Sequence, residues 1–223
     1  MINLLNESQL IEAMVRIDTS FVRDRINKLK NQIIKIGEPA REDDRGRSIK
    51  IADILNKTFK DEKIVFKYES GGSKYGIVGG FAKEDHIEVY FNSSLAYELS
   101  DDEFWNEFLA IVEGTIHHEM VHRGQIVRAN IKHPGISRKK IGFDKDLDTW
   151  EQYYGSPHEI MAYATSVYYE MIEFGMSHEV MRKTIRSGNL AGVSDVYKEY
   201  ESMFPRGHKV LNRLLKHVGD IVG

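Results

Sequence analysis

Three short segments between residues 61 and 93 differ from the rest of the chain and limit the folds that it can adopt. They are rich in β-branched and aromatic residues and are separated by glycine-rich turns; their sequences are KIVFKY (63–68), YGIVGGF (75–81) and HIEVYFN (86–92). This pattern predicts three strands. Three short strands form only a small sheet, which we expect to be mostly antiparallel, so helices must supply most of the core. The sequence therefore predicts a predominantly helical α+β fold.

Apolar residues recur at helical spacing on both sides of these strands. Before the strands, the spacing predicts a helix over residues 7–35, with a break near residues 18–20. A shorter helix follows a charged loop at 38–47, and Ser48 is its expected N-cap.

A long helix is expected directly after the strands, packed against the sheet. Ser100 and Glu103 have the spacing of a capping box, and the helix that they begin should end near residue 130. A loop is expected over residues 132–155, and Ser156, followed by proline, then begins a second helix that ends near Gly175. Shorter helices are expected at 178–187, 191–203 and 206–220.

The domain organisation and the partner class follow from length and charge. We expect an N-terminal helical segment at 1–60, a core at 61–176 and a C-terminal helical segment at 177–223, together forming one compact domain. Lys and Arg number 31 against 34 Asp and Glu, so neither nucleic acid nor a membrane surface is an expected partner. The first residues lack the pattern of a signal peptide, and no apolar run has membrane-spanning length. A cytoplasmic protein is expected.

The sequence HEMVH at residues 118–122 is the clearest candidate for a functional site. His118 and His122 lie on one helix face, one turn apart, where both imidazoles can bind one zinc ion at about 2.0–2.1 Å. Glu119 projects about 100° away from His118, so it can reach a metal-bound water more easily than the metal. The chain has no cysteine, so His, Asp or Glu must supply any further ligand. The alternative is a pair of hydrogen-bonded core histidines.

Two further residues of this helix differ in their expected places. Gln125 continues the face that carries His118 and His122. His117 has no histidine four positions later, and we expect it at the surface or beside the metal-binding residues.

A catalytic zinc site needs a third protein ligand that leaves one position for water. The spacing HExxHxxGxxH does not supply it, because Arg128 stands where the third histidine would be. The candidates are the neighbours His158 and Glu159 on the next predicted helix. The apolar stripe of that helix lies closer to Glu159, so Glu159 is the expected ligand and His158 faces solvent. The alternative is that Glu159 closes a capping box with Ser156.

HEMVH on a helix, with a sheet before it and a later helix that begins Glu-x-x-Ala, resembles the zincin metallopeptidases. The later glutamate resembles the gluzincin branch, and the order of motifs over residues 86–175 is similar to that of small ImmA/IrrE-like members. The resemblance implies that His118, His122 and Glu159 bind zinc and that Glu119 is the general base. It also implies that strand 86–92 pairs with an extended substrate. The chain departs from the ImmA/IrrE pattern because it has no evident DNA-binding helix-turn-helix and a different C-terminal region.

Zincin chemistry also needs a hydrogen-bond donor for the oxyanion that forms on the substrate. Tyr163, one turn after Glu159, and Tyr154, which precedes the flexible Gly155, are the preferred candidates. Tyr153 and His158 are also available. The alternative for each tyrosine is an ordinary packing role.

The sequence thus predicts a zinc-dependent metallopeptidase that hydrolyses a peptide or protein substrate, with a metal-activated water as the nucleophile. The alternative is a non-enzymatic structural, assembly or binding protein that retains the metal site on a zincin scaffold. Hydrolysis of a nucleic acid has little support, because the charge balance provides no phosphate-binding surface.

Overall fold

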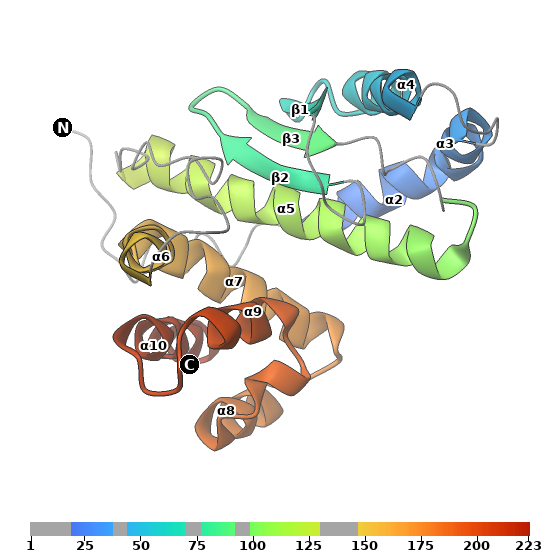
Figure 1. Ribbon diagram of the computed structural model, residues 1–223. Coiled ribbons are helices and arrows are strands. Elements are labelled where there is room, and N and C mark those ends of the chain that lie inside the picture. The colour runs from blue at the N-terminus through green and yellow to red at the C-terminus, as the bar shows by residue number, and fades with distance from the viewer. Residues whose placement is uncertain (1–18, 38–43, 70–76, 92–98, 130–146) are drawn as a thin grey trace. The chain divides into compact units, whose positions relative to one another are not determined.

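Helices form most of the residues described by the computed structural model, which are 19–37, 44–69, 77–91, 99–129 and 147–223. In this part of the chain they accompany a small three-stranded sheet, so the predicted α+β class is confirmed (Figure 1). The chain forms two compact units, which we call the sheet unit (Ile17–Arg123) and the C-terminal unit (Gly124–Gly223). None of the described helices is both long and apolar enough to cross a lipid bilayer.

The sheet unit contains the three predicted strands and the helices around them. Its elements are α2 (Ser20–Lys28), α3 (Lys30–Gly37), α4 (Asp44–Thr58), β1 (Ile64–Tyr68), β2 (Ile77–Ala82), β3 (Ile87–Phe91) and α5 (Asp102–Ala129), which continues into the C-terminal unit. The helix expected over residues 7–35 is described only from residue 19 onward. There it forms two helices, α2 and α3, which are separated at Leu29.

The sheet has the strand order β1-β3-β2 and is mixed (Figure 1). β3 runs antiparallel to β2 and parallel to β1. The expected sheet was mostly antiparallel, whereas the observed sheet has one antiparallel and one parallel pair of strands. The β2–β3 hairpin places β3 beside β1, so the first and third strands have the same direction. β3 is therefore the central strand, and β1 and β2 are the outer strands of the described sheet.

Aromatic side chains join the sheet to the helices of the sheet unit. Phe91 on β3 stacks on Phe66 of β1, with ring centroids 5.5 Å apart, and lies 6.3 Å from the ring of Phe108 on α5. Phe66 also contacts Phe59, which follows α4. Side chains alternate between the two faces of a strand, so Phe91 and its neighbour-but-one Val89 identify the face that α5 covers.

The two helix starts predicted in this unit are corrected by five residues for α4 and by one residue for α5. α4 begins at Asp44, and Ser48 is a buried residue inside the helix rather than its N-cap. α5 begins after Asp101, whose Oδ1 accepts hydrogen bonds from the backbone N–H groups of Glu103 (2.9 Å) and Phe104 (3.0 Å). Asp101, not Ser100, therefore caps α5, because its carboxylate satisfies two donors at the positive end of the helix.

The C-terminal unit is helical throughout its described part. Its elements are α6 (Leu147–Tyr154), α7 (Pro157–Glu173), α8 (His178–Ser187), a 3₁₀ turn (Leu190–Gly192), α9 (Asp195–Met203) and α10 (Lys209–Val222). α8 has the predicted bounds, and α7 begins as predicted, with Ser156 as N-cap and proline in the first turn. The loop expected over residues 132–155 is wrong at its end, where α6 forms. Residues 130–146 lie outside the described residues.

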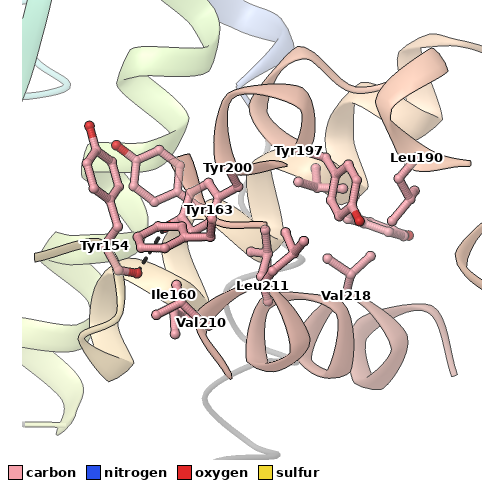
Figure 2. Packing of buried hydrophobic residues seen from close by; sticks show 14 of the residues in the cluster. Tyr154, Ile160, Tyr163, Leu190, Tyr197, Tyr200, Val210, Leu211 and Val218 are labelled. Carbon is pink, nitrogen blue, oxygen red and sulfur yellow. Dashed lines mark hydrogen bonds between the residues drawn. The ribbon is translucent and has the colours of Figure 1, made fainter. Parts of the chain in front are cut away.

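The core of the C-terminal unit is built from one face of each of several helices (Figure 2). Tyr163 from α7, Tyr200 from α9 and Leu211 from α10 are all buried in it. α6 contributes Tyr153 and Tyr154, which explains why this segment folds as a helix instead of remaining a loop: its two tyrosines are buried in the core.

Candidate metal centre

Two histidines converge on one face of α5. The Nε2 atoms of His118 and His122 lie 3.0 Å apart, and the ring centroids are 4.6 Å apart in an edge-on arrangement. Their spacing of four residues places them one turn apart on the helix, as the sequence predicts. His122 is buried and His118 is partly exposed. Two nitrogen donors are thus directed to one point by the geometry of a single helix.

Glu159 lies in the first turn of α7, and its side chain is 0% exposed. The capping box that could have occupied this carboxylate does not form. The backbone N–H of Ser156 donates to the carbonyl of Tyr153 (3.1 Å), and the Ser156 hydroxyl donates to the same carbonyl (2.7 Å). The Ser156 hydroxyl also lies 3.4 Å from His158 Nε2, and it makes no capping bond to the first turn of α7.

His118, His122 and Glu159 form a group that could hold a metal ion. Each residue offers one ligand atom, and these atoms all lie within 4.8 Å of one another. Two imidazole nitrogens and one carboxylate oxygen are a donor set that suits zinc and several other divalent transition metals. The group contains Glu159 and not His158. Successive residues of a helix project about 100° apart, so the side chain of His158 has a different direction.

Glu119 is buried, with 6% of its surface exposed, and lies against the outer strand β2. A Cβ atom on Gly80 would be 2.9 Å from both the carboxyl carbon and Oε1 of Glu119, and closer still to Cγ. Gly80 pairs with Val89, so it belongs to the sheet face that α5 covers. The glycine thus leaves the space that the side chain of Glu119 fills.

The strand order changes which strand is available beside Glu119. The prediction that residues 86–92 pair with an extended substrate is wrong, because β3 already has a neighbour on each side. β2 is an outer strand, and Gly80 brings it against Glu119. An extended chain could therefore add to the described sheet beside β2, but not beside β3.

His117 is a buried residue, only 2% exposed, so the expected surface position is wrong. Burial lowers the pKa of its imidazole to about 3, and the neighbouring His118 adds to this shift. The ring is neutral at pH 7. The helical spacing of α5 places His117 on a different side of the helix from His118 and His122. The spacing alone does not show that this side is also buried.

The other face of the sheet contains a buried carboxylate that could be mistaken for a second site. Glu88 Oε1 accepts hydrogen bonds from Lys67 Nζ (2.5 Å) and Lys83 Nζ (2.7 Å) and lies 3.1 Å from His86 Nε2; Oε2 accepts one from the Tyr90 hydroxyl (2.5 Å). Burial raises the pKa of Glu88, but these four bonds together lower it well below its usual range. The carboxylate is neutralised within its own cluster, which joins β1 to β3.

The two tyrosines proposed as oxyanion donors belong to a buried aromatic cluster. The ring of Tyr154 is 5.7 Å from that of Tyr163, and both contact Tyr200, whose hydroxyl donates to the carbonyl of Tyr154 (3.1 Å; Figure 2). Burial raises the pKa of Tyr200, with smaller contributions from Tyr163 and Glu159, so Tyr200 lies near the candidate ligand. Sequence reasoning missed Tyr200. The spacing of Tyr197, Tyr200 and Phe204 marks a buried face but not its neighbours.

Comparison with known proteins leaves the site to be interpreted from its own residues. Neither a scan against protein-family models nor searches of curated proteins and of solved structures found a match to this chain. The interpretation therefore depends on the His118, His122 and Glu159 group and on the position of Glu119 beside it in the sequence.

Proposed function

We propose that this chain is a zinc-dependent metallopeptidase, with His118, His122 and Glu159 as the zinc-binding residues. The observation that supports it most is the convergence of these three ligand atoms within 4.8 Å, two from an H-E-x-x-H helix and one from a later helix. When bound, zinc would polarise a peptide carbonyl and lower the pKa of a water molecule to about 7. Three protein ligands leave a coordination position for that chemistry, whereas structural zinc sites usually have four.

Glu119 is the proposed general base. It follows His118 directly, so the helix carries it beside the metal-binding face without making it a ligand. Its side chain lies against β2, where Gly80 has no side chain to displace it. In this role Glu119 accepts a proton from the attacking water and later donates it to the leaving amine.

β2 is the proposed docking strand for the substrate. An outer strand offers unpaired backbone groups to an extended peptide, and β2 is the outer strand that contacts Glu119. A peptide paired with β2 near Gly80 would have its backbone beside the proposed base. Tyr154 and Tyr163 remain the proposed donors to the oxyanion, on the basis of the position of Tyr163 one turn after Glu159.

The test is Glu119→Gln, with metal content and hydrolysis of an unfolded protein substrate as the two measurements. The variant should retain stoichiometric zinc and lose peptidase activity by a factor of about 100 or more, because a positioned general base contributes on that scale. Glu107→Gln, an exposed position on the same helix, is the matched control and should retain both. A zinc-loaded Glu119→Gln protein with undiminished activity would exclude the proposed role.

A structural metal site is the second candidate. It is favoured by the complete burial of Glu159, since a metal ligand in a catalytic site is often reachable from solvent. Removal of the metal by a chelator separates the two functions. A structural site predicts a large loss of thermal stability on chelation, whereas the peptidase proposal predicts loss of hydrolysis from a chain that remains folded.

A further inference from the structure

We infer that Gln125 is a positioning residue for the metal centre, because it holds the first turn of α7 at the place from which Glu159 reaches the metal. This inference depends on the proposed metal centre but not on the peptidase reaction. It gives a role to a buried polar residue that the H-E-x-x-H pattern leaves unexplained.

Gln125 lies on the metal-binding face of α5. It follows His122 by three residues and His118 by seven, spacings that place all three side chains on one side of a helix. Its side chain is 1% exposed. A buried amide of this kind is stabilising only when its polar atoms are hydrogen-bonded.

The Gln125 amide donates a hydrogen bond from Nε2 to the backbone carbonyl of His158 at 3.2 Å. His158 is the residue directly before Glu159, in the first turn of α7. The bond therefore joins the end of the helix that carries both histidines to the backbone beside the third ligand. Both residues belong to the C-terminal unit, so the contact is internal to it.

The bond from Gln125 fixes the rotation of the first turn of α7, which the bonds at the start of α7 do not fix. The two bonds from Ser156 to Tyr153 fix where the chain enters α7. They do not fix how the first turn is rotated relative to α5. The bond from Gln125 does, since it holds one carbonyl of that turn, and the Glu159 carboxylate is carried by the next residue. Partners of this kind, which hold a ligand in place without binding the metal, typically contribute a factor of about 10–100 to metal affinity.

Glutamine suits this role because it combines length with a neutral donor. Gln125→Met keeps the length and the apolar stem but has no donor. Gln125→Asn keeps the amide but shortens its reach by one methylene. Both variants should leave the three ligands chemically intact and weaken only their arrangement.

The matched control is Asn56 on α4, in the sheet unit. Its side chain also bonds a backbone, donating to the carbonyl of Phe66 (2.9 Å) and accepting from the N–H of the same residue (2.6 Å). Asn56→Ala therefore removes the same kind of bond from a place that carries no metal-binding residue. It should lower the melting temperature and leave metal affinity unchanged.

The experiment measures affinity for zinc by chelator competition and the absorption spectrum of the Co²⁺-loaded protein, using the full chain. For Gln125→Met and Gln125→Asn we expect zinc dissociation constants raised about 10–100-fold, and a changed Co²⁺ spectrum. Wild-type affinity in either folded variant overturns the inference, as does a similar loss of affinity in Asn56→Ala. A wild-type chain that binds neither metal overturns both this inference and the metal centre. Zinc binding without any hydrolysis contradicts the peptidase proposal alone.

Discussion

The His118 and His122 pair in the sheet unit and Glu159 in the C-terminal unit are positioned in different ways. In the sheet unit, His118 and His122 are brought together by the pitch of one helix, and five consecutive residues contain the whole arrangement. In the C-terminal unit, Glu159 is placed by the cap of α7, by the core around Tyr163 and by the bond from Gln125. Two ligands thus depend on local geometry and the third depends on packing. The arrangement of the two histidines should therefore depend on α5 alone, while the position of Glu159 should also respond to changes in the core around it.

Removal of single ligands should produce the largest effects and tests this contrast directly. His122→Ala and Glu159→Gln should each lose stoichiometric metal, because two ligands rarely retain zinc against water. Glu159→Gln replaces a buried carboxylate with an amide of the same size, so its loss of metal can be assigned to the missing ligand atom. A Glu159→Gln protein that retains stoichiometric metal would contradict the assignment of Glu159 as the third ligand.

Glu170, at the other end of α7, should make the stability of the C-terminal unit depend on pH. Burial raises the pKa of its carboxyl group to about 7, and Asp195 and Glu173 add to the shift, against the hydrogen bonds from the Ser194 hydroxyl and the Val196 N–H. The folded chain thus binds this proton more tightly than the unfolded chain. The resulting stabilisation is complete below about pH 4.5 and is lost as the pH rises to about 7, a change of about 3 kcal/mol at most.

Thermal unfolding of the metal-free chain as a function of pH measures this effect. Glu170→Gln should remove the loss of stability between mildly acidic and neutral pH. Glu199→Gln, an exposed position on α9, is the matched control and should keep it. If the two variants show the same pH dependence as the wild type, Glu170 does not carry the effect.

Gly80→Ala should have a smaller effect, in the sheet unit. The added Cβ collides with Glu119, so we expect a loss of about 2 kcal/mol in the free energy of unfolding and a loss of hydrolysis with retained zinc. In a Glu119→Ala background the same change should cost much less, since the colliding atoms are gone. Gly114→Ala is the control on α5. Among the described residues, no heavy atom outside the backbone of its own helix lies within 4 Å of the added Cβ, so this change should stabilise the chain by about 1 kcal/mol. Equal costs for Gly80→Ala in both backgrounds would contradict the contact.

Features that depend on neighbouring residues in the sequence were predictable. β-branched and aromatic segments between turn residues predicted the three strands, and helical spacing with capping residues predicted the bounds of α8 and the N-cap of α7 at Ser156. The pairing of His118 with His122 follows from a spacing of four residues. Glu159 was selected over His158 because the apolar stripe of α7 lies on its side, and Glu159 belongs to the group that could hold a metal.

Features that depend on tertiary neighbours were not predictable. A strand pattern does not show that β3 inserts beside β1, and so the wrong strand was expected to have a free edge. His117 and Tyr200 are buried by other parts of the fold, which their own helical positions do not reveal. Asp101 and Ser100 are both good capping residues, and only the hydrogen bonds to Glu103 and Phe104 distinguish them.

The continuity of α5 limits how this protein can diverge. The helix runs without interruption from Asp102 to Ala129, and His118, His122 and Gln125 depend on a common phase along it. Insertion or deletion of one residue between His118 and Gln125 would turn everything that follows by about 100°. Related genes should therefore vary in identity at Met120 and Arg123 while conserving the number of codons across this stretch.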